Sequence, residues 1–144
     1  MSVAAILKNK GHSVYTVRPE HTVSETAALL TSKRVGVAVV CDGQGRIAGV
    51  VSERDIVAGV TRYGKAILDM PVRNIMSFPV ITCQPGHSIK DIMQEMNERR
   101  IRHLPVVEKG ELVGIVSIGD AVAYRLRETQ LEVGVLRDLA AAIR

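Results

Sequence analysis

Two stretches of sequence decide the fold: GVVSERDIV at residues 49–57 and GIVSIGDAV at residues 114–122. In each stretch a glycine precedes a short apolar run, and the run passes directly into Ser-x-x-Asp. A serine followed three residues later by an acidic residue is a signal for the start of a helix. Each stretch therefore predicts a strand that leads into a helix without an intervening loop.

Outward from these stretches, the two halves of the chain align with each other. One residue is missing from the second half in the turn that follows Asp42. Identical residues pair at Val14/Val80, Thr16/Thr82, Pro19/Pro85, His21/His87, Arg34/Arg100, Val40/Val106, Gly45/Gly110, Gly49/Gly114, Val51/Val116, Ser52/Ser117, Asp55/Asp120 and Val57/Val122. The segments that precede the two copies are also similar: VAAIL from Val3 and VRNIM from Val72. A period of about 65 residues is too long for a solenoid repeat, so the chain contains two copies of one small α/β unit.

Each copy has the pattern of a β-α-β-β-α unit. The first copy predicts a strand at 13–17, a helix from Thr22 to about Arg34, strands within 35–42 and 46–52, and a helix from about Glu53. The second predicts a strand at 80–82, a helix from 88, strands at 103–108 and 111–117, and a helix from about 118. The fold class is α/β (α+β). We expect repeats at 1–66 and 67–144, the second with a C-terminal helical extension, packed with pseudo-twofold symmetry because neither unit covers its own sheet.

Composition excludes several classes of protein. Apolar residues make up 47% of the chain, and no apolar run approaches the ~20 residues of a membrane span. The apolar stretch at the N-terminus is too short for a signal peptide, and two cysteines do not make a disulfide framework. We therefore expect a cytoplasmic protein without a membrane partner. The four histidines lack metal-ligand spacing, and no nucleophile–base pair or P-loop is evident, so we expect neither a metal site nor an enzyme.

The ordered motifs, found twice, resemble a tandem pair of cystathionine-β-synthase (CBS) domains. The resemblance covers nearly the whole chain and includes RRIRHLPVVE at 99–108. It implies a stand-alone regulatory module that binds an adenosyl ligand and signals to a downstream protein that the sequence does not identify. AMP is the first expectation among these ligands, with ADP, ATP, NAD(H) and S-adenosylmethionine as alternatives.

The two Ser-x-x-Asp turns have a structural and a functional interpretation. In the structural one, the serine and the aspartate only cap a helix. In the functional one, the helix N-terminus attracts an anion and the aspartate accepts hydrogen bonds from ribose hydroxyls while it faces outward.

The family resemblance implies sites shared between the copies. The first would use Ser52, Arg54, Asp55, Val80, Ile81, Thr82, Arg102 and His103. The second would use Ser117, Gly119, Asp120, Val14, Thr16, Gly36 and Val37. The first is the more basic and can meet a phosphate, whereas the second would need charge from a neighbour such as Lys33.

Two other functions remain open, and one assembly is expected. With both turns acting only as caps, the chain would be a ligand-free structural or interaction protein. A net charge of +4 weakly favours nucleic acid, but aromatic residues for base stacking amount to only 3% of the chain. Leu131, Val135, Leu139 and Ala142 form an apolar row beyond the repeat, which either folds back on its own core or is covered by a second subunit. The family resemblance favours the second subunit, because CBS pairs commonly form twofold dimers, so we expect a homodimer.

Overall fold

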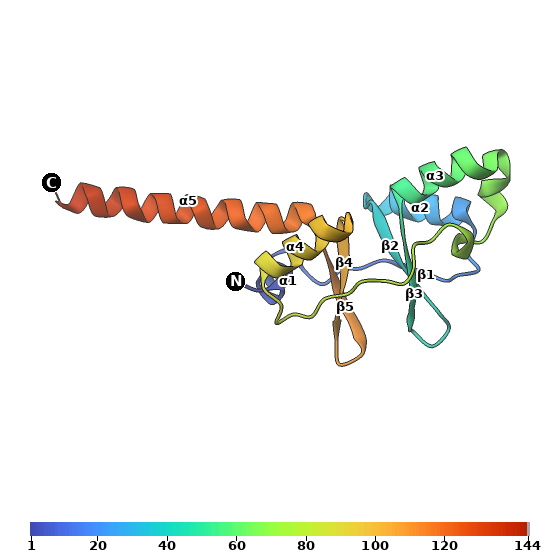
Figure 1. The fold of residues 1–144 in the computed structure, drawn as a ribbon, viewed down its shortest axis with the longest axis horizontal. Coiled ribbons are helices and arrows are strands. Elements are labelled where there is room, and N and C mark those ends of the chain that lie inside the picture. Colours follow the sequence, from blue (N-terminus) through green and yellow to red (C-terminus); the bar gives the residue numbers. More distant parts are fainter. Residues whose placement is uncertain (144) are drawn as a thin grey trace.

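The computed structural model describes residues 1–143, which form two α+β halves side by side and one long helix that projects from the second half (Figure 1). The first half contains β1 (Thr16–Val17), α2 (Val23–Lys33), β2 (Val37–Cys41), β3 (Ile47–Ser52) and α3 (Glu53–Tyr63). The second contains α4 (Ile89–Arg99), β4 (His103–Glu108), β5 (Glu111–Ser117) and α5 (Ile118–Ile143). Before the first half lies α1 (Val3–Lys10), and before the second lie the 3-10 turns η1 (Gly64–Asp69) and η2 (Val72–Asn74). The predicted fold class and tandem order are confirmed.

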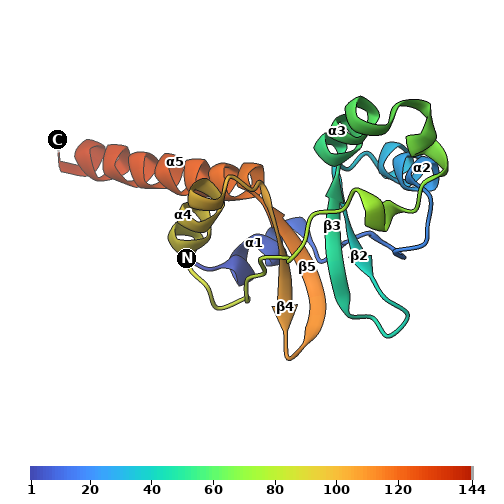
Figure 2. The ribbon, with the colours of Figure 1, turned by 45° about the vertical axis from the view of Figure 1, so that its right-hand side comes forward.

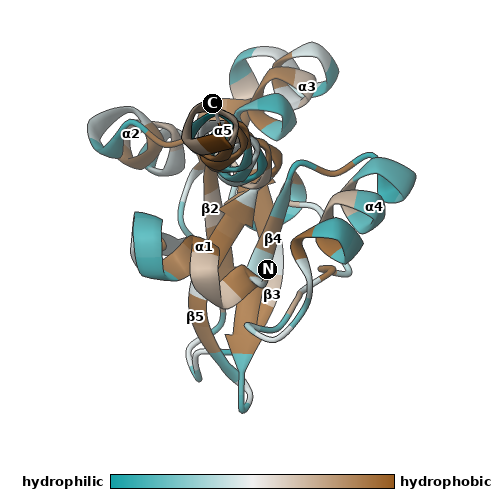
Figure 3. Ribbon diagram, turned by 90° about the vertical axis from the view of Figure 1, so that its left-hand side faces the viewer, coloured by the Kyte–Doolittle hydropathy of each residue, from teal (hydrophilic) through white to brown (hydrophobic). Residues whose placement is uncertain are grey.

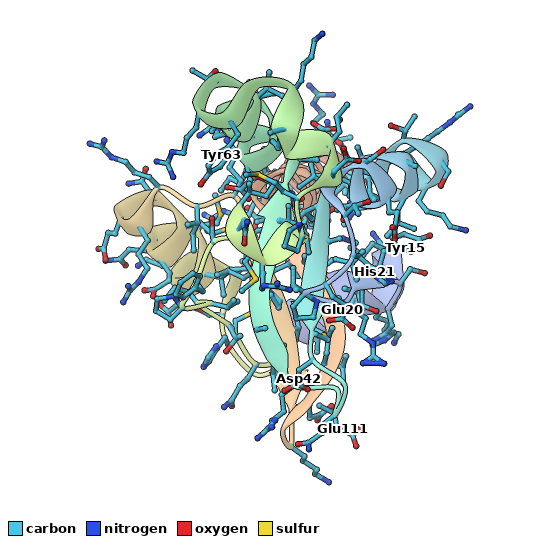
Figure 4. All side chains as sticks on the ribbon, turned by 90° about the vertical axis from the view of Figure 1, so that its right-hand side faces the viewer. Tyr15, Glu20, His21, Asp42, Tyr63 and Glu111 are labelled. Atoms are coloured by element: carbon cyan, nitrogen blue, oxygen red, sulfur yellow. The ribbon has the colours of Figure 1, made fainter. Side chains whose placement is uncertain are left out.

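Each half is built around an antiparallel hairpin. In the first, β2 pairs antiparallel with β3 and parallel with β1, which gives the sheet order β1-β2-β3. In the second, β4 and β5 form a two-stranded sheet. Both hairpin tips lie at one end of the molecule, where Asp42 and Glu111 are labelled in Figure 4. The other ends of the hairpins therefore lead into the helices α3 and α5 (Figure 2).

The first strand of each copy is shorter than predicted, and the second copy shows why. The stretch 13–17 contains only the two-residue β1, and 80–82 is not a strand, since the only pairing there is a bridge from Cys83 to Val106. In the first copy the Val39 N–H donates to the Tyr15 carbonyl. The equivalent of Val39 is Pro105, which has no N–H to donate, so the second copy loses this ladder bond.

The segments that precede the two copies are exchanged between the cores. Val3 in α1 donates its N–H to the His87 carbonyl at 2.9 Å, and Val72 in η2 donates to the His21 carbonyl at 2.7 Å. Both valines are fully buried, Val3 in the second core and Val72 in the first. The sequence similarity of 3–7 and 72–76 therefore reflects two equivalent exchanged segments, and α1 is a helix that the sequence did not lead us to expect.

The exchange explains the glycine at the start of each deciding stretch. A Cβ atom on Gly49 would lie 2.5 Å from the Met76 sulfur, and one on Gly114 would lie 2.9 Å from a methyl group of Leu7. Both distances are shorter than side-chain packing permits. The two glycines thus leave room for the exchanged segments to pack against β3 and β5.

The halves meet through apolar sheet surface. Val37 and Val39 of β2 and Ile115 of β5 are buried in one cluster, which Val50 and Leu112 border. Removing this aliphatic surface from water stabilises the pairing of the halves. It also holds the helical ends of both hairpins beside each other, which is where the candidate sites lie.

Candidate functional site

A cleft of about 300 Å³ opens between the two halves at the N-terminus of α3. It is lined by Gly36, Val37, Val50, Ser52, Glu53, Arg54, Asp55, Ser77, Pro79, Val80, Ile81, Arg100, Ile101, Arg102 and His103. Every residue predicted for the first site lines this cleft except Thr82. Thr82 is exposed and lies outside the cleft, whereas the two residues before it, Val80 and Ile81, line it.

Asp55 turns back toward the helix start, contrary to the expectation that it faces outward. Its Oδ2 accepts hydrogen bonds from the Ser52 N–H at 2.8 Å and the Ser52 hydroxyl at 3.1 Å. The Ser52 hydroxyl oxygen in turn accepts from the Asp55 N–H, which completes a capping box. Oδ1 accepts from the Ser77 hydroxyl at 3.2 Å. Asp55 is half-buried at the cleft wall. A ribose hydroxyl that binds its carboxylate would have to donate beside these three hydrogen bonds or replace one of them.

Basic side chains from both halves line this cleft. Arg102 and Arg54 are exposed, and so is Arg100, which the sequence reasoning did not include. Arg100 ends α4 in a left-handed conformation with φ 55, which turns the chain back toward the cleft. The signal for it was available, because Arg100 belongs to the same RRIRH run as Arg102. Glu53 is the acidic residue that partly offsets this charge.

His103 is the half-buried member of the basic group. Burial lowers the pKa of its imidazole, the charges of Lys10 and Arg102 lower it further, and Asp120 and Glu53 act in the opposite direction. The imidazole is therefore mostly neutral at neutral pH. In that state it is a hydrogen-bonding group toward a phosphate rather than a cation.

A second cleft, of about 430 Å³, opens at the N-terminus of α5. It is lined by Lys10, Ser13, Val14, Tyr15, Arg34, Val35, Gly36, Val37, His103, Ile115, Ser117 and Asp120. Of the residues predicted for the second site, Thr16 and Gly119 do not line it, and both are exposed. Gly36, Val37 and His103 line both clefts, so the two sites share a wall.

The charge of the second cleft comes from a source that the sequence did not indicate. Lys10, at the end of α1, donates to Asp120 Oδ2 at 2.7 Å and to the Ile115 carbonyl at 2.9 Å. Asp120 also accepts from the Ser117 N–H at 2.9 Å, as Asp55 does from Ser52. Lys33 does not line the cleft; its ammonium lies 5.7 Å from the ring centre of Tyr15, which Figure 4 labels.

The ion pair changes what Asp120 can do. Burial raises the pKa of Asp120, but the hydrogen bond from Lys10, the bonds from Ser117 and the charge of Lys10 outweigh it and hold the pKa below its usual range. The carboxylate is thus ionised and already paired. The two Ser-x-x-Asp turns have the same cap but differ beyond it: Asp120 is paired with Lys10, whereas Asp55 accepts from the Ser77 hydroxyl and has no ion-pair partner among residues 1–143.

Two further features are absent from residues 1–143. No group of three or more His, Cys, Asp or Glu side chains in this range is placed to hold a metal ion. None of the helices in the same range is both long and apolar enough to cross a membrane.

Comparison with known proteins identifies the family. The pattern of the CBS domain matches residues 7–61 and 72–127. The chain is 37% identical over 113 residues to the CBS domain-containing protein YhcV of Bacillus subtilis, covering 78% of this chain and 79% of that protein.

Solved structures of the same fold agree. The CBS-domain containing protein ATU1752 of Agrobacterium tumefaciens superposes with a TM-score of 0.84 and 39% identity, covering 86% of this chain and 92% of that one. The CBS domain protein PAE2072 of Pyrobaculum aerophilum, solved in complex with AMP, superposes with a TM-score of 0.74 and 33% identity, covering 83% and 89%. With two matched copies, the exchanged segments and a cleft at each Ser-x-x-Asp turn, the chain belongs to the CBS domain family as a tandem CBS pair.

Proposed function

We propose that this CBS pair binds an adenine nucleotide in the first cleft and regulates a downstream protein through the change in packing that binding causes. The observation that carries the proposal is the composition of this cleft. Apolar side chains from the 80–81 segment lie across from the N-terminus of α3, and Arg54, Arg102 and His103 surround the same space. Apolar walls with a few placed polar groups are typical of small-molecule sites.

Each part of a nucleotide has a matching group in the cleft. Val80 and Ile81 would hold the base between aliphatic surfaces, and Asp55 would accept from the ribose hydroxyls. Arg102 would bind the phosphate, where a guanidinium gives two parallel hydrogen bonds. The positive end of the α3 dipole adds to this attraction for an anion.

Among the adenosyl ligands we place AMP first. A volume of about 300 Å³ is at the low end of small-molecule pockets, which favours a mononucleotide over NAD(H). The relative PAE2072 was solved in complex with AMP, which supports the same choice. ADP, ATP and S-adenosylmethionine carry the same adenosine and belong in the same test.

The mechanism that we propose is a population shift. Because both halves line the cleft, a ligand that contacts both favours one arrangement of the halves over others. A downstream protein in the cytoplasm would respond to that arrangement, and the chain itself would act as a homodimer without catalytic activity. We propose the repeats 1–66 and 67–144 as the two moving parts, with the exchanged segments moving with the cores that hold them: α1 with the second and residues 72–76 with the first.

A ligand-free structural role is the second candidate, and one observation favours it. Both Ser-x-x-Asp turns form complete reciprocal caps without any ligand. In that case the two clefts would be surface features with no occupant.

A nucleotide titration separates these two candidates. Isothermal calorimetry and thermal unfolding should be measured with AMP, ADP, ATP, NAD and S-adenosylmethionine, with adenosine and GMP as controls. A nucleotide at about 100 times its dissociation constant adds roughly 2.7 kcal/mol to the free energy of unfolding if it binds only the folded chain. No heat and no change in melting temperature with any of them at millimolar concentration would overturn the nucleotide proposal and leave the structural one.

A further inference from the structure

The helix α5 extends well beyond the core that its first turns help to cover. From Thr129 to Ile143 every residue is exposed except Gly134, which is half-buried. Figure 1 shows this part of the helix projecting away from both halves, and Figure 3, viewed from that end, shows hydrophobic residues along it. A helix of this length with no packing is marginal in water, and Gly134 weakens it further. The projecting segment therefore needs a partner surface to be stable.

One row of residues on this segment repeats with alternating steps of three and four residues. The row, which we call the seam, consists of Leu126, Thr129, Val133, Leu136, Ala140 and Ile143. Its large side chains are between 42% and 85% exposed. Only Thr129 is polar. Such spacing is the a/d pattern of a coiled coil.

The row that first suggested a homodimer is a weaker candidate for this surface. Leu131, Val135 and Ala142 lie on the side of α5 that continues from Ala121 and Tyr124, which pack on the second core. At three-and-four spacing that row also contains Glu128 and Asp138, and the alternative member Leu139 breaks the alternation. Two charges in an apolar contact row are unfavourable, so the seam is the better match to a helical partner.

The charges beside the seam identify the partner as a second copy of the same helix. With Val133 at position a and Leu136 at position d, Glu132 occupies position g and Arg137 the following position e. In a parallel, in-register pair, the g residue of one helix lies beside the e residue five positions later on the other. Glu132 of each copy would thus lie beside Arg137 of the other, twice by symmetry. Neither residue has an ion-pair partner among residues 1–143.

The packing residues point to the same number of strands. At the centre of the seam, Val133 at a and Leu136 at d give the combination that favours a two-stranded parallel coil, whereas Leu126 at a and Ile143 at d do not follow it. We propose that α5 pairs with α5 of a second copy as a parallel two-stranded coiled coil along the seam. This inference rests on the homodimer proposed above and names the surface that forms it.

Matched leucines on the same helix test the seam. Leu136, in the seam, and Leu131, outside it, are 65% and 69% exposed, so neither substitution disturbs a core. Sedimentation equilibrium of the full chain at micromolar concentration should give twice the 15.6 kDa of one copy for the wild type and for Leu131→Asp. Leu136→Asp should give a single copy with unchanged melting of the body. A dimer that survives Leu136→Asp would overturn the helix pairing while the homodimer stood, and a monomeric wild type would overturn both.

A charge exchange tests the parallel register. Glu132→Arg and Arg137→Glu should each raise the dimer dissociation constant, because each places two like-charged pairs beside the seam. The double variant Glu132→Arg/Arg137→Glu should restore the wild-type constant. If the double variant loses as much dimer affinity as the two single variants together, the proposed parallel register is wrong, since an antiparallel pair would not place Glu132 beside Arg137.

Discussion

Replacing Asp55 with alanine should weaken the binding of AMP with little loss of fold. The carboxylate accepts three hydrogen bonds, from the Ser52 N–H, the Ser52 hydroxyl and the Ser77 hydroxyl. The Ser52 hydroxyl still caps the backbone of residue 55 after the substitution, so the loss should be about 1 kcal/mol of stability, as for one cap. A carboxylate that accepts from ribose hydroxyls contributes roughly 1.5–3 kcal/mol, which is about ten- to a hundredfold in affinity.

Asp120→Ala is the matched control for this experiment. It removes the same residue from the same type of capping box, and it also breaks the ion pair with Lys10. Its stability should therefore fall at least as much as that of Asp55→Ala, while AMP affinity in the first cleft should stay within about threefold, which is less than 1 kcal/mol. Both quantities can be measured on each variant, affinity by calorimetry and stability by thermal unfolding. Loss of AMP binding in Asp120→Ala with retention in Asp55→Ala would assign the nucleotide to the second cleft, and equal small losses would mean that both aspartates only cap helices.

Three further results are expected. Arg102→Ala should weaken AMP at least about tenfold and leave adenosine unchanged, since a charged hydrogen bond to phosphate contributes roughly 1.5–3 kcal/mol; calorimetry with both ligands tests this, and equal losses would exclude a phosphate contact. The free energy of unfolding should fall as the pH is lowered below about 6.5, because burial lowers the pKa of His103 in the folded state and the unfolded chain then binds more protons. In His103→Gln, the free energy of unfolding measured by urea denaturation should depend less on pH in this range. An unchanged pH dependence in this variant would contradict the attribution to His103. Gly49→Ala should lower the melting temperature and cost about 1–3 kcal/mol of stability, since its methyl group would lie 2.5 Å from the Met76 sulfur and 3.0 Å from the Ser77 carbonyl oxygen. The double variant Gly49→Ala/Met76→Ala should recover only part of the lost stability, because the contact with the Ser77 backbone remains.

The fold was predictable from sequence because the repeat supplied it twice. Alternating apolar runs, the two capping signals and the glycine turns placed the helices and hairpins close to their observed bounds. The first strands were overestimated because ladder bonds depend on the neighbouring strand, and the sequence of 80–82 says nothing of Pro105 opposite it. The helix α1 was missed because its core partners, such as Ile89 and Met96, lie in the other half of the chain.

The first site was more predictable than the second for a physical reason. Arg54, Asp55 and Arg102 lie within motifs that the repeat brings to one place, and all three line the first cleft, where the family resemblance placed them; their contact with a ligand stays a prediction. Lys10 reaches Asp120 only because α1 packs on the second half, 110 residues away in sequence. No sequence pattern near Ser117 or Asp120 indicates that contact. Thr82 and Gly119 show that a residue's position in a motif does not determine whether it lines the cleft.

The exchange of the segments that precede each repeat has a consequence for how the chain is made. During synthesis α1 leaves the ribosome before both repeats, and its packing partners in α4 and β5 follow it by about 80 to 115 residues. Until they emerge, Val3, Ile6 and Leu7 remain exposed on a helix of eight residues, which is too short to be stable alone. The first repeat can assemble once residues 71–76 have been added, whereas the helix at the start of the chain must wait until the second repeat is complete. The helix α1 is thus translated before both repeats and is among the last segments to acquire its native contacts.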